Sequence, residues 1–107
     1  MEINEKLEEI AMTIIANAGA SKSTSFAALS KAKGGDFEEA KKLLKAADEA
    51  EAEAHKMHST LLQMFAKGEV KEADILIAHA QDHLMAATLS KELIYELVEV
   101  YEKLKER

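Results

Sequence analysis

The sequence contains no cysteine, no proline and no tryptophan, and only four of its 107 residues are glycine. Without cysteine there is no disulfide framework. Because no secretory signal peptide is recognisable either, we expect the protein to reside in the cytoplasm. No apolar run approaches the roughly 20 residues that a membrane-spanning helix needs. The length predicts a single domain, residues 1–107, whose modest core would benefit from self-association.

Aromatic residues and positive charge are also scarce. The chain has three phenylalanines and two tyrosines, and its formal net charge is −6. Nucleic-acid binders depend on a basic surface and on aromatic side chains that stack on bases. Anionic membrane surfaces attract basic segments. We therefore expect neither a nucleic acid nor a membrane among the partners.

The few helix-breaking residues divide the chain into three long helices. Gly34 and Gly35 end the first, and Asp36 caps the second, with Glu39 completing a capping box. Gly68 marks the other break. The predicted helices, each about 45–50 Å long, cover residues 4–33, 36–67 and 71–105. Short connections make neighbouring helices antiparallel, so we predict an all-α, up-down-up three-helix bundle.

Three segments carry predictions about packing. Residues 19–25 contain five weak helix formers, so we expect the first helix to bend there or to approach a neighbour closely. They are Gly19, Ser21, Ser23, Thr24 and Ser25. Residues 48–53 alternate acidic residues with alanine, which is typical of a solvated helix face. His55 and His58 are spaced to share a metal ion. One helix alone supplies too few ligands, so a solvated face is the preferred interpretation.

The third predicted helix carries two apolar stripes when residues are placed about 100° apart around its axis. The first stripe consists of Leu76, Ala80, Ala87, Ile94, Val98 and Tyr101, with Leu84 on its edge. The second consists of Ile75, Ala86, Leu89, Leu93, Leu97, Val100 and Leu104. One stripe is enough to pack against two other helices, so the second predicts contact with further copies of the chain. The alternative is one wide face that serves a single core.

The tract from His79 to Met85 places two imidazoles and a carboxylate within about one helical turn. A histidine ring nitrogen can accept a phosphoryl group and pass it on, with Gln81 or His83 as candidate donors to the phosphoryl oxygens. His79 and Asp82 lie on the second stripe. A carboxylate there must be neutral, paired or bound to a metal, and copies that meet on a symmetry axis would need a cation or shared protons.

Two other interpretations of this tract remain open. His79, Asp82 and His83 have the spacing of the inverted zinc-peptidase motif H-x-x-E-H, with aspartate in place of glutamate. Histidines four residues apart can share one metal, but a zinc hydrolase also needs a third ligand and a substrate cleft. In the other interpretation, the chain is a structural helical oligomerisation module and His79 is incidental.

The tract Ile77–Met85 closely resembles the signature of the enzyme IIA components of the bacterial lactose and cellobiose/diacetylchitobiose phosphotransferase systems. Gly35-Asp36-Phe37-Glu38-Glu39-Ala40 resembles the turn between the first two helices of that family. Glu53-Ala54-His55-Lys56 resembles its second helix, and Ala18-Gly19 its first. The resemblance covers nearly the whole chain.

This resemblance implies a phosphotransferase component that acts only with partner proteins and forms a homotrimer of three-helix bundles. His79 would be the phosphorylated residue, taking the phosphoryl group from phosphohistidine HPr and passing it to a cysteine of enzyme IIB. Enzyme IIC would import the sugar. Asp82 would bind a metal, typically Mg²⁺, shared by three subunits on the trimer axis. Gln81 and His83 stay candidate supports.

The chain departs from the family pattern at several positions. The family often has Gly-Asp-Ala-Arg-Ser where this chain has Gly19-Ala20-Ser21-Lys22-Ser23, so an acid is lost and a lysine replaces the arginine that could bind bidentately. Ala86 stands where the family usually has threonine. Ala80 follows the cellobiose branch, whereas lactose members tend to have glycine there. We therefore expect a β-linked disaccharide of the cellobiose or chitobiose type.

Overall fold

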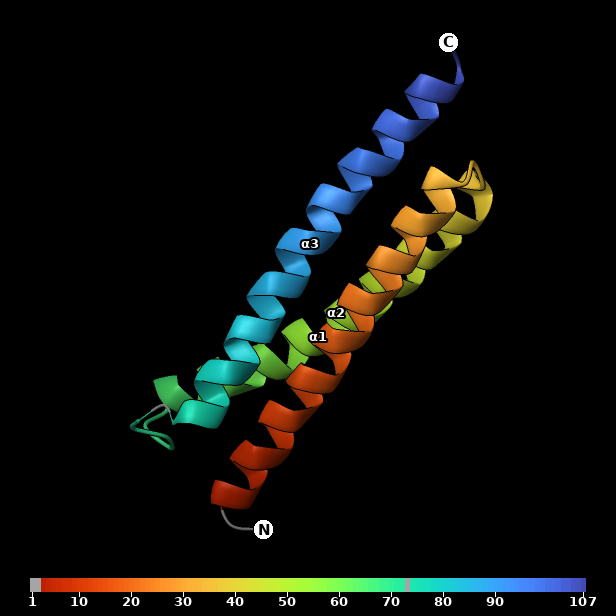
Figure 1. Cartoon of the computed structure of the whole chain (residues 1–107). Coiled ribbons are helices and arrows are strands. Elements are labelled where there is room, and N and C mark those ends of the chain that lie inside the picture. Colours follow the sequence, from red (N-terminus) through yellow and green to blue (C-terminus); the bar gives the residue numbers. More distant parts are fainter. Residues whose placement is uncertain (1–2, 73) are drawn as a thin grey trace.

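The computed structural model describes residues 3–72 and 74–107. Its elements are the helices α1 (Ile3–Lys33), α2 (Phe37–Ala66) and α3 (Ile75–Lys105). They lie side by side in an elongated bundle of 57 × 19 × 19 Å, with the α1–α2 turn and the C-terminus at the same end (Figure 1). The predicted all-α, antiparallel three-helix bundle is confirmed. Over the described ranges, no helix combines the length and the apolar character needed to cross a membrane.

The α1–α2 turn is closed by a glycine in the left-handed region. Gly35 has a φ of +88°, its N–H donates to the Ala32 carbonyl at 3.0 Å, and the Asp36 N–H donates to the Lys31 carbonyl at 2.9 Å. This pair of bonds is a Schellman motif. The Asp36 carboxylate then caps α2 by accepting from the Glu39 N–H at 3.1 Å. Because the Asp36 N–H is already used by Lys31, the capping box forms only in this one direction.

The α2–α3 connection is longer than predicted, because α3 begins at Ile75 and not at residue 71. A second Schellman motif at Gly68, with a φ of +76°, ends α2. Val70 is then buried in the core, which keeps residues 69–72 out of a helix. The helix restarts only where Asp74 caps it by accepting from the Ile77 N–H at 2.9 Å.

Small side chains let the helices pack closely. Fully buried alanines occur in all three helices: Ala18, Ala28, Ala40, Ala47, Ala54, Ala80 and Ala87. Between residues 19 and 25, α1 stays helical, and the hydroxyl of Ser21 donates to the Ala47 carbonyl of α2 at 2.9 Å. The predicted close approach in this serine-rich segment is therefore confirmed, and it places a serine against the backbone of α2.

The two stripes of α3 have different environments. The first is buried or half-buried against α1 and α2, as predicted. The second is exposed along the whole helix, with relative exposures of 89% at Ile75, 58% at Leu89, 55% at Leu93 and 55% at Leu104. The interpretation as one wide face serving a single core is therefore wrong. An apolar stripe of this length on one helix is typical of a surface that binds another protein or another copy.

Candidate functional site

His79 lies at a shallow hollow of about 330 Å³ on the side of the bundle, between α1 and α3. The hollow is lined by Lys22, His79, Asp82, His83 and Ala86, and we call it the His79 hollow. Four of these residues belong to α3, where positions three and four apart lie on one face. Lys22 is added by α1, which packs along α3. The structure therefore brings a cation, a carboxylate and two imidazoles to one opening.

The two imidazoles of the hollow contact each other. The Nε2 atoms of His79 and His83 are 3.0 Å apart, and the rings meet edge to face at 88° with centroids 4.4 Å apart. At this distance one nitrogen donates and the other accepts, so at least one ring must be neutral. His79 is exposed and His83 is half-buried. A neutral, exposed imidazole with an unprotonated nitrogen can act as a nucleophile.

Asp82 is exposed and sits within the second stripe, beside the two histidines. Among the described residues, no hydrogen bond or ion pair to its carboxylate is found, and no three metal-ligating side chains converge. The zinc-hydrolase interpretation needs three protein ligands, and those convergent ligands are missing from residues 3–72 and 74–107. For an ion that prefers oxygen ligands, each chain supplies the Asp82 carboxylate at this position.

Gln81 points away from the hollow. Its side-chain nitrogen is 3.3 Å from Nε2 of His58 on α2. Two residues along a helix correspond to about 200° around its axis, so Gln81 and His79 face opposite sides of α3. Burial lowers the pKa of His58, and the charge of His55 lowers it further. A neutral His58 can accept a hydrogen bond from Gln81, which ties α3 to α2.

The sequence prediction of the site did not include Lys22. The only indication of Lys22 in the sequence was that it stands where the resembled family often has an arginine in the first helix. The structure shows that this position lines the hollow beside His79, although it lies far from His79 in the sequence. Ala86, the other departure, also lines the hollow, so a threonine hydroxyl at this position would face the same opening.

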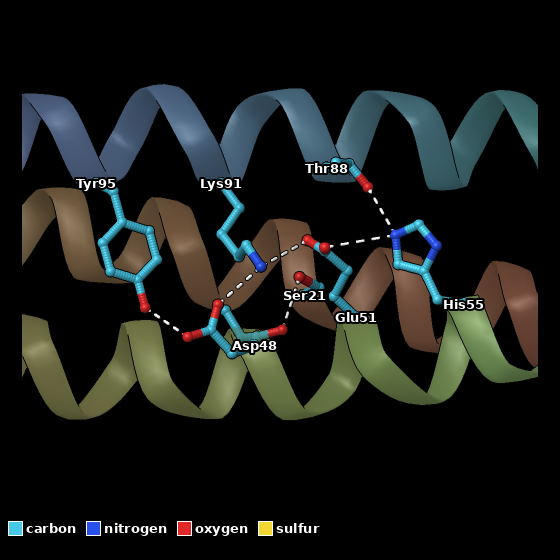
Figure 2. Close-up of polar contacts among 8 residues, drawn as sticks. Ser21, Asp48, Glu51, His55, Thr88, Lys91 and Tyr95 are labelled. Carbon is cyan, nitrogen blue, oxygen red and sulfur yellow. Dashed lines mark hydrogen bonds and ion pairs between the residues drawn. The ribbon is translucent and has the colours of Figure 1, made fainter.

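A second group of polar side chains joins α2 to α3 farther along the bundle (Figure 2). The Lys91 ammonium lies 2.7 Å from Asp48 and 2.9 Å from Glu51. The Tyr95 hydroxyl donates to Asp48, and His55 lies 3.5 Å from Glu51. We call this set the α2–α3 polar cluster; it comprises Asp48, Glu51, His55, Thr88, Lys91 and Tyr95.

The polar cluster corrects the prediction that residues 48–53 form a solvated face. Glu51 is buried, with a relative exposure of 8%, and Asp48 is half-buried. The alternation of acids and alanines does not reveal this, because the partner Lys91 comes from another helix. Glu49 and Glu53 are exposed, as expected.

The charges of the polar cluster stabilise one another. Burial raises the pKa of Asp48, but hydrogen bonds from Lys91 and Tyr95 outweigh it and leave that pKa below its usual value of 3.8. Burial lowers the pKa of Lys91, but Asp48 and Glu51 outweigh it and raise that pKa above 10.5. Burial and the hydrogen bond to Asp48 raise the pKa of Tyr95 to about 12. The cluster is an ion-pair network between two helices.

Comparison with known proteins places this geometry in a family. The family described as "PTS system, Lactose/Cellobiose specific IIA subunit" matches residues 9–102. The "Lichenan-specific phosphotransferase enzyme IIA component" of Bacillus subtilis is 42% identical over 98% of this chain and 96% of its own length. The crystal structure of the cellobiose-specific enzyme IIA from Bacillus anthracis superimposes with a TM-score of 0.92 at 39% identity, covering 100% of this chain and 95% of that chain.

A further matching structure was solved as a complex with HPr. The solution structure of the IIA(Chitobiose)–HPr complex of Escherichia coli contains a chain that matches with a TM-score of 0.82 at 41% identity, covering 92% of this chain and 96% of that chain. Sequence, fold and length therefore agree with the resemblance found from the His79 tract. The chain belongs to the lactose/cellobiose-specific IIA subunit family and is a phosphotransferase-system component.

Proposed function

We propose that this protein is a cytoplasmic phosphohistidine carrier that takes a phosphoryl group from HPr onto His79 and delivers it to enzyme IIB. The main structural support for this proposal is the His79 hollow. It exposes an imidazole next to a second imidazole and a lysine, in a chain that belongs to a family of phosphotransferase components. The relative solved in complex with HPr supports the choice of donor.

The transfer consists of two displacements at phosphorus. In the first, the unprotonated ring nitrogen of His79 attacks the phosphorus of phosphohistidine HPr. The P–N bond to HPr breaks, and its electron pair returns to the HPr imidazole. In the second, a cysteine thiolate of enzyme IIB attacks the same phosphorus, and the P–N bond to His79 breaks. Such transfers depend mainly on positioning and on charge stabilisation.

Two side chains of the hollow can support the transfer. The phosphoryl group brings close to two negative charges, next to the carboxylate of Asp82. The Lys22 ammonium is the cation that lines the same hollow, and it would offset this repulsion. His83, whose Nε2 lies 3.0 Å from that of His79, would fix the neighbouring ring and donate to a phosphoryl oxygen. Gln81 would act only through α2, by way of its contact with His58.

Asp82 and the second stripe support a homotrimer. Mg²⁺ prefers oxygen ligands, and an exposed carboxylate with no partner among the described residues suits it. Three copies that pack their second stripes together would bring three Asp82 carboxylates to one axis, where Mg²⁺ would offset their mutual repulsion. The ion would hold the assembly together, and the phosphoryl transfer is carried by His79.

The sugar is expected to be a β-linked disaccharide of the cellobiose or chitobiose type. The relatives described above are named for lichenan, cellobiose and diacetylchitobiose. The alanine at position 80, which is fully buried against the core, agrees with the cellobiose branch. The sugar would contact enzyme IIC and not this chain, so neighbouring genes for IIB, IIC and a glycosidase are the observation that identifies it.

The experiment is a phosphoryl chase. The protein is labelled with phosphoenolpyruvate, enzyme I and HPr, freed of HPr, and mixed with the cognate enzyme IIB. We expect the label to move to the IIB cysteine and His79→Ala to carry none. A protein that stays unlabelled would favour the structural oligomerisation module, and a label that never leaves for IIB would contradict the carrier role.

A further inference from the structure

We propose that His79 and His83 form a two-imidazole chelate for a divalent transition-metal ion such as Zn²⁺, and that this ion competes with the phosphoryl group. The competition rests on the proposed function of His79, whereas the chelate itself rests on geometry alone. The site differs from the one expected for Mg²⁺ at Asp82, because its ligands are ring nitrogens.

The distance between the two nitrogens fits a shared metal. Two nitrogens that each lie 2.0–2.1 Å from a tetrahedral zinc are about 3.3 Å apart. The Nε2 atoms of His79 and His83 are 3.0 Å apart already, so the rings need to separate by only a few tenths of an ångström. They must also rotate from their edge-to-face contact at 88°, which an exposed and a half-buried side chain can do.

The second histidine pair of the chain lacks this geometry and serves as an internal comparison. The rings of His55 and His58 are directed to different partners: His55 contacts Glu51 and Thr88, and His58 contacts Gln81. Histidines three residues apart also share a helix face, but the rings of these two are already engaged by different partners. We therefore expect the metal to bind His79 and His83 in preference to His55 and His58.

The chemistry of the ligands selects the class of ion. Imidazole suits Zn²⁺, Cu²⁺ and Ni²⁺, whereas Mg²⁺ prefers oxygen. Two protein ligands leave the other coordination positions to water, so binding should be reversible. The opposite charges of Lys22 and Asp82 in the hollow balance each other, so neither prevents a cation from approaching.

The bound ion would oppose phosphorylation. A metal on Nε2 of His79 occupies that lone pair, and it also makes the remaining ring nitrogen a poorer nucleophile. Phosphorylation of the ring in turn removes a metal ligand. By linkage, each event weakens the other by the same factor. The carrier would therefore be inhibited reversibly by transition metals and unaffected in this respect by Mg²⁺.

The binding test uses the full chain and Zn²⁺ alone, with the imidazole resonances followed by NMR at neutral pH in excess Mg²⁺. We expect the His79 and His83 signals to shift together, and those of His55 and His58 to stay. In His83→Gln, the affinity for zinc should fall by about tenfold or more, while the matched control His55→Gln should bind as the wild type does. Equal affinities of wild type and His83→Gln would overturn the chelate.

The competition test measures transfer from phosphohistidine HPr with and without Zn²⁺. The rate of each variant with zinc is divided by its own zinc-free rate, and these ratios are compared between the wild type and His83→Gln, because any effect of zinc on HPr is common to both. Saturating zinc should slow the wild type by at least about tenfold, chelator should restore it, and His83→Gln should be less sensitive. Zinc that binds without slowing the transfer would overturn the competition. A chain that binds zinc but is never phosphorylated by HPr would instead overturn the proposed function and leave the chelate standing.

Discussion

Lys22 is the residue that α1 contributes to the His79 hollow, at the position where the resemblance described above leads us to expect arginine. Lysine offers one point charge, whereas arginine can bind two phosphoryl oxygens at once. We expect Lys22→Met to slow phosphorylation by HPr by about tenfold, the loss of one charge-assisted hydrogen bond. Lys22→Arg should keep or raise the rate. Single-turnover transfer measures both, and a Lys22→Met rate equal to that of the wild type would exclude this role.

Lys91 gives a stability prediction with a pH dependence. Its side chain is 14% exposed and pairs with the Glu51 side chain, which is 11% exposed, and with Asp48. Lys91→Met removes the ammonium partner of both carboxylates, leaving Asp48 with the Tyr95 hydroxyl and Glu51 with His55, and should lower the free energy of unfolding by about 2 kcal/mol at neutral pH. Urea denaturation checks this. Lys103→Met, an exposed lysine on the same helix, should change the stability by less than about 0.5 kcal/mol.

The direction of each pKa shift sets the pH window of this contribution. The pKa of Asp48 lies below 3.8 when folded, so its contribution is present above about pH 4 and is lost as the pH falls through the folded pKa. The pKa values of Lys91 and Tyr95 are raised, that of Tyr95 to about 12, so their contributions are lost as the pH rises above about 10. In Lys91→Met the stability should vary less with pH at both ends, and an unchanged profile would contradict the network.

At the scale of the helices, the α1–α2 turn provides a matched pair of adjacent glycines. Gly35 has a φ of +88°, so Gly35→Ala should cost about 1 kcal/mol. Gly34 lies outside the left-handed region, and an added Cβ would meet its nearest neighbour at an ordinary 3.6 Å. Gly34→Ala should therefore be neutral or stabilising by about 0.5 kcal/mol. Thermal denaturation distinguishes the two variants. If both lost the same stability, the positive φ at position 35 would not be the cause of the loss.

The elements that the sequence could predict are those with local causes. The glycine breaks and Asp36 act within a few residues, so the first two helices follow from them. The predicted start of α3 at residue 71 was wrong. Val70 is buried by tertiary packing, which the local sequence does not reveal. The two stripes of α3 were visible from periodicity alone, and their opposite exposure confirms them.

The residues of the site were predictable only where they share one helix. His79, Asp82 and His83 follow from the spacing on α3, and the structure brings them to one hollow. Lys22 and the pairing of Lys91 with Glu51 connect different helices, and no local pattern encodes which residues meet across them. Gln81 was predicted as a support because it is close to His79 in the sequence. In the structure its side chain faces α2.

For the whole molecule, the exposed second stripe predicts that three copies assemble into a homotrimer. Leu93→Glu places a charge where Leu93 is 55% exposed in the middle of the stripe, and it should convert a trimer to monomers in analytical ultracentrifugation. Gln63→Glu adds the same charge at an exposed position of α2 and should leave the trimer intact. A wild-type chain that sediments as a monomer at micromolar concentration would contradict the assembly.

Analytical ultracentrifugation also tests whether Asp82 binds a metal ion on the trimer axis. With a chelator, the wild-type trimer should weaken, because the three carboxylates then repel one another without a shared ion. Asp82→Asn removes that repulsion, so its trimer should form equally well with and without chelator. A wild-type trimer that is indifferent to both chelator and Mg²⁺ would rule out a structural ion on the axis.

Intact-mass measurement after incubation with phosphoenolpyruvate, enzyme I and HPr shows whether His79 carries the phosphoryl group. The wild type should gain one acid-labile phosphoryl group per chain, and so should His55→Ala, which removes a histidine outside the hollow. His79→Ala should gain none. A phosphoryl group that appears on His79→Ala as readily as on the wild type would contradict the account.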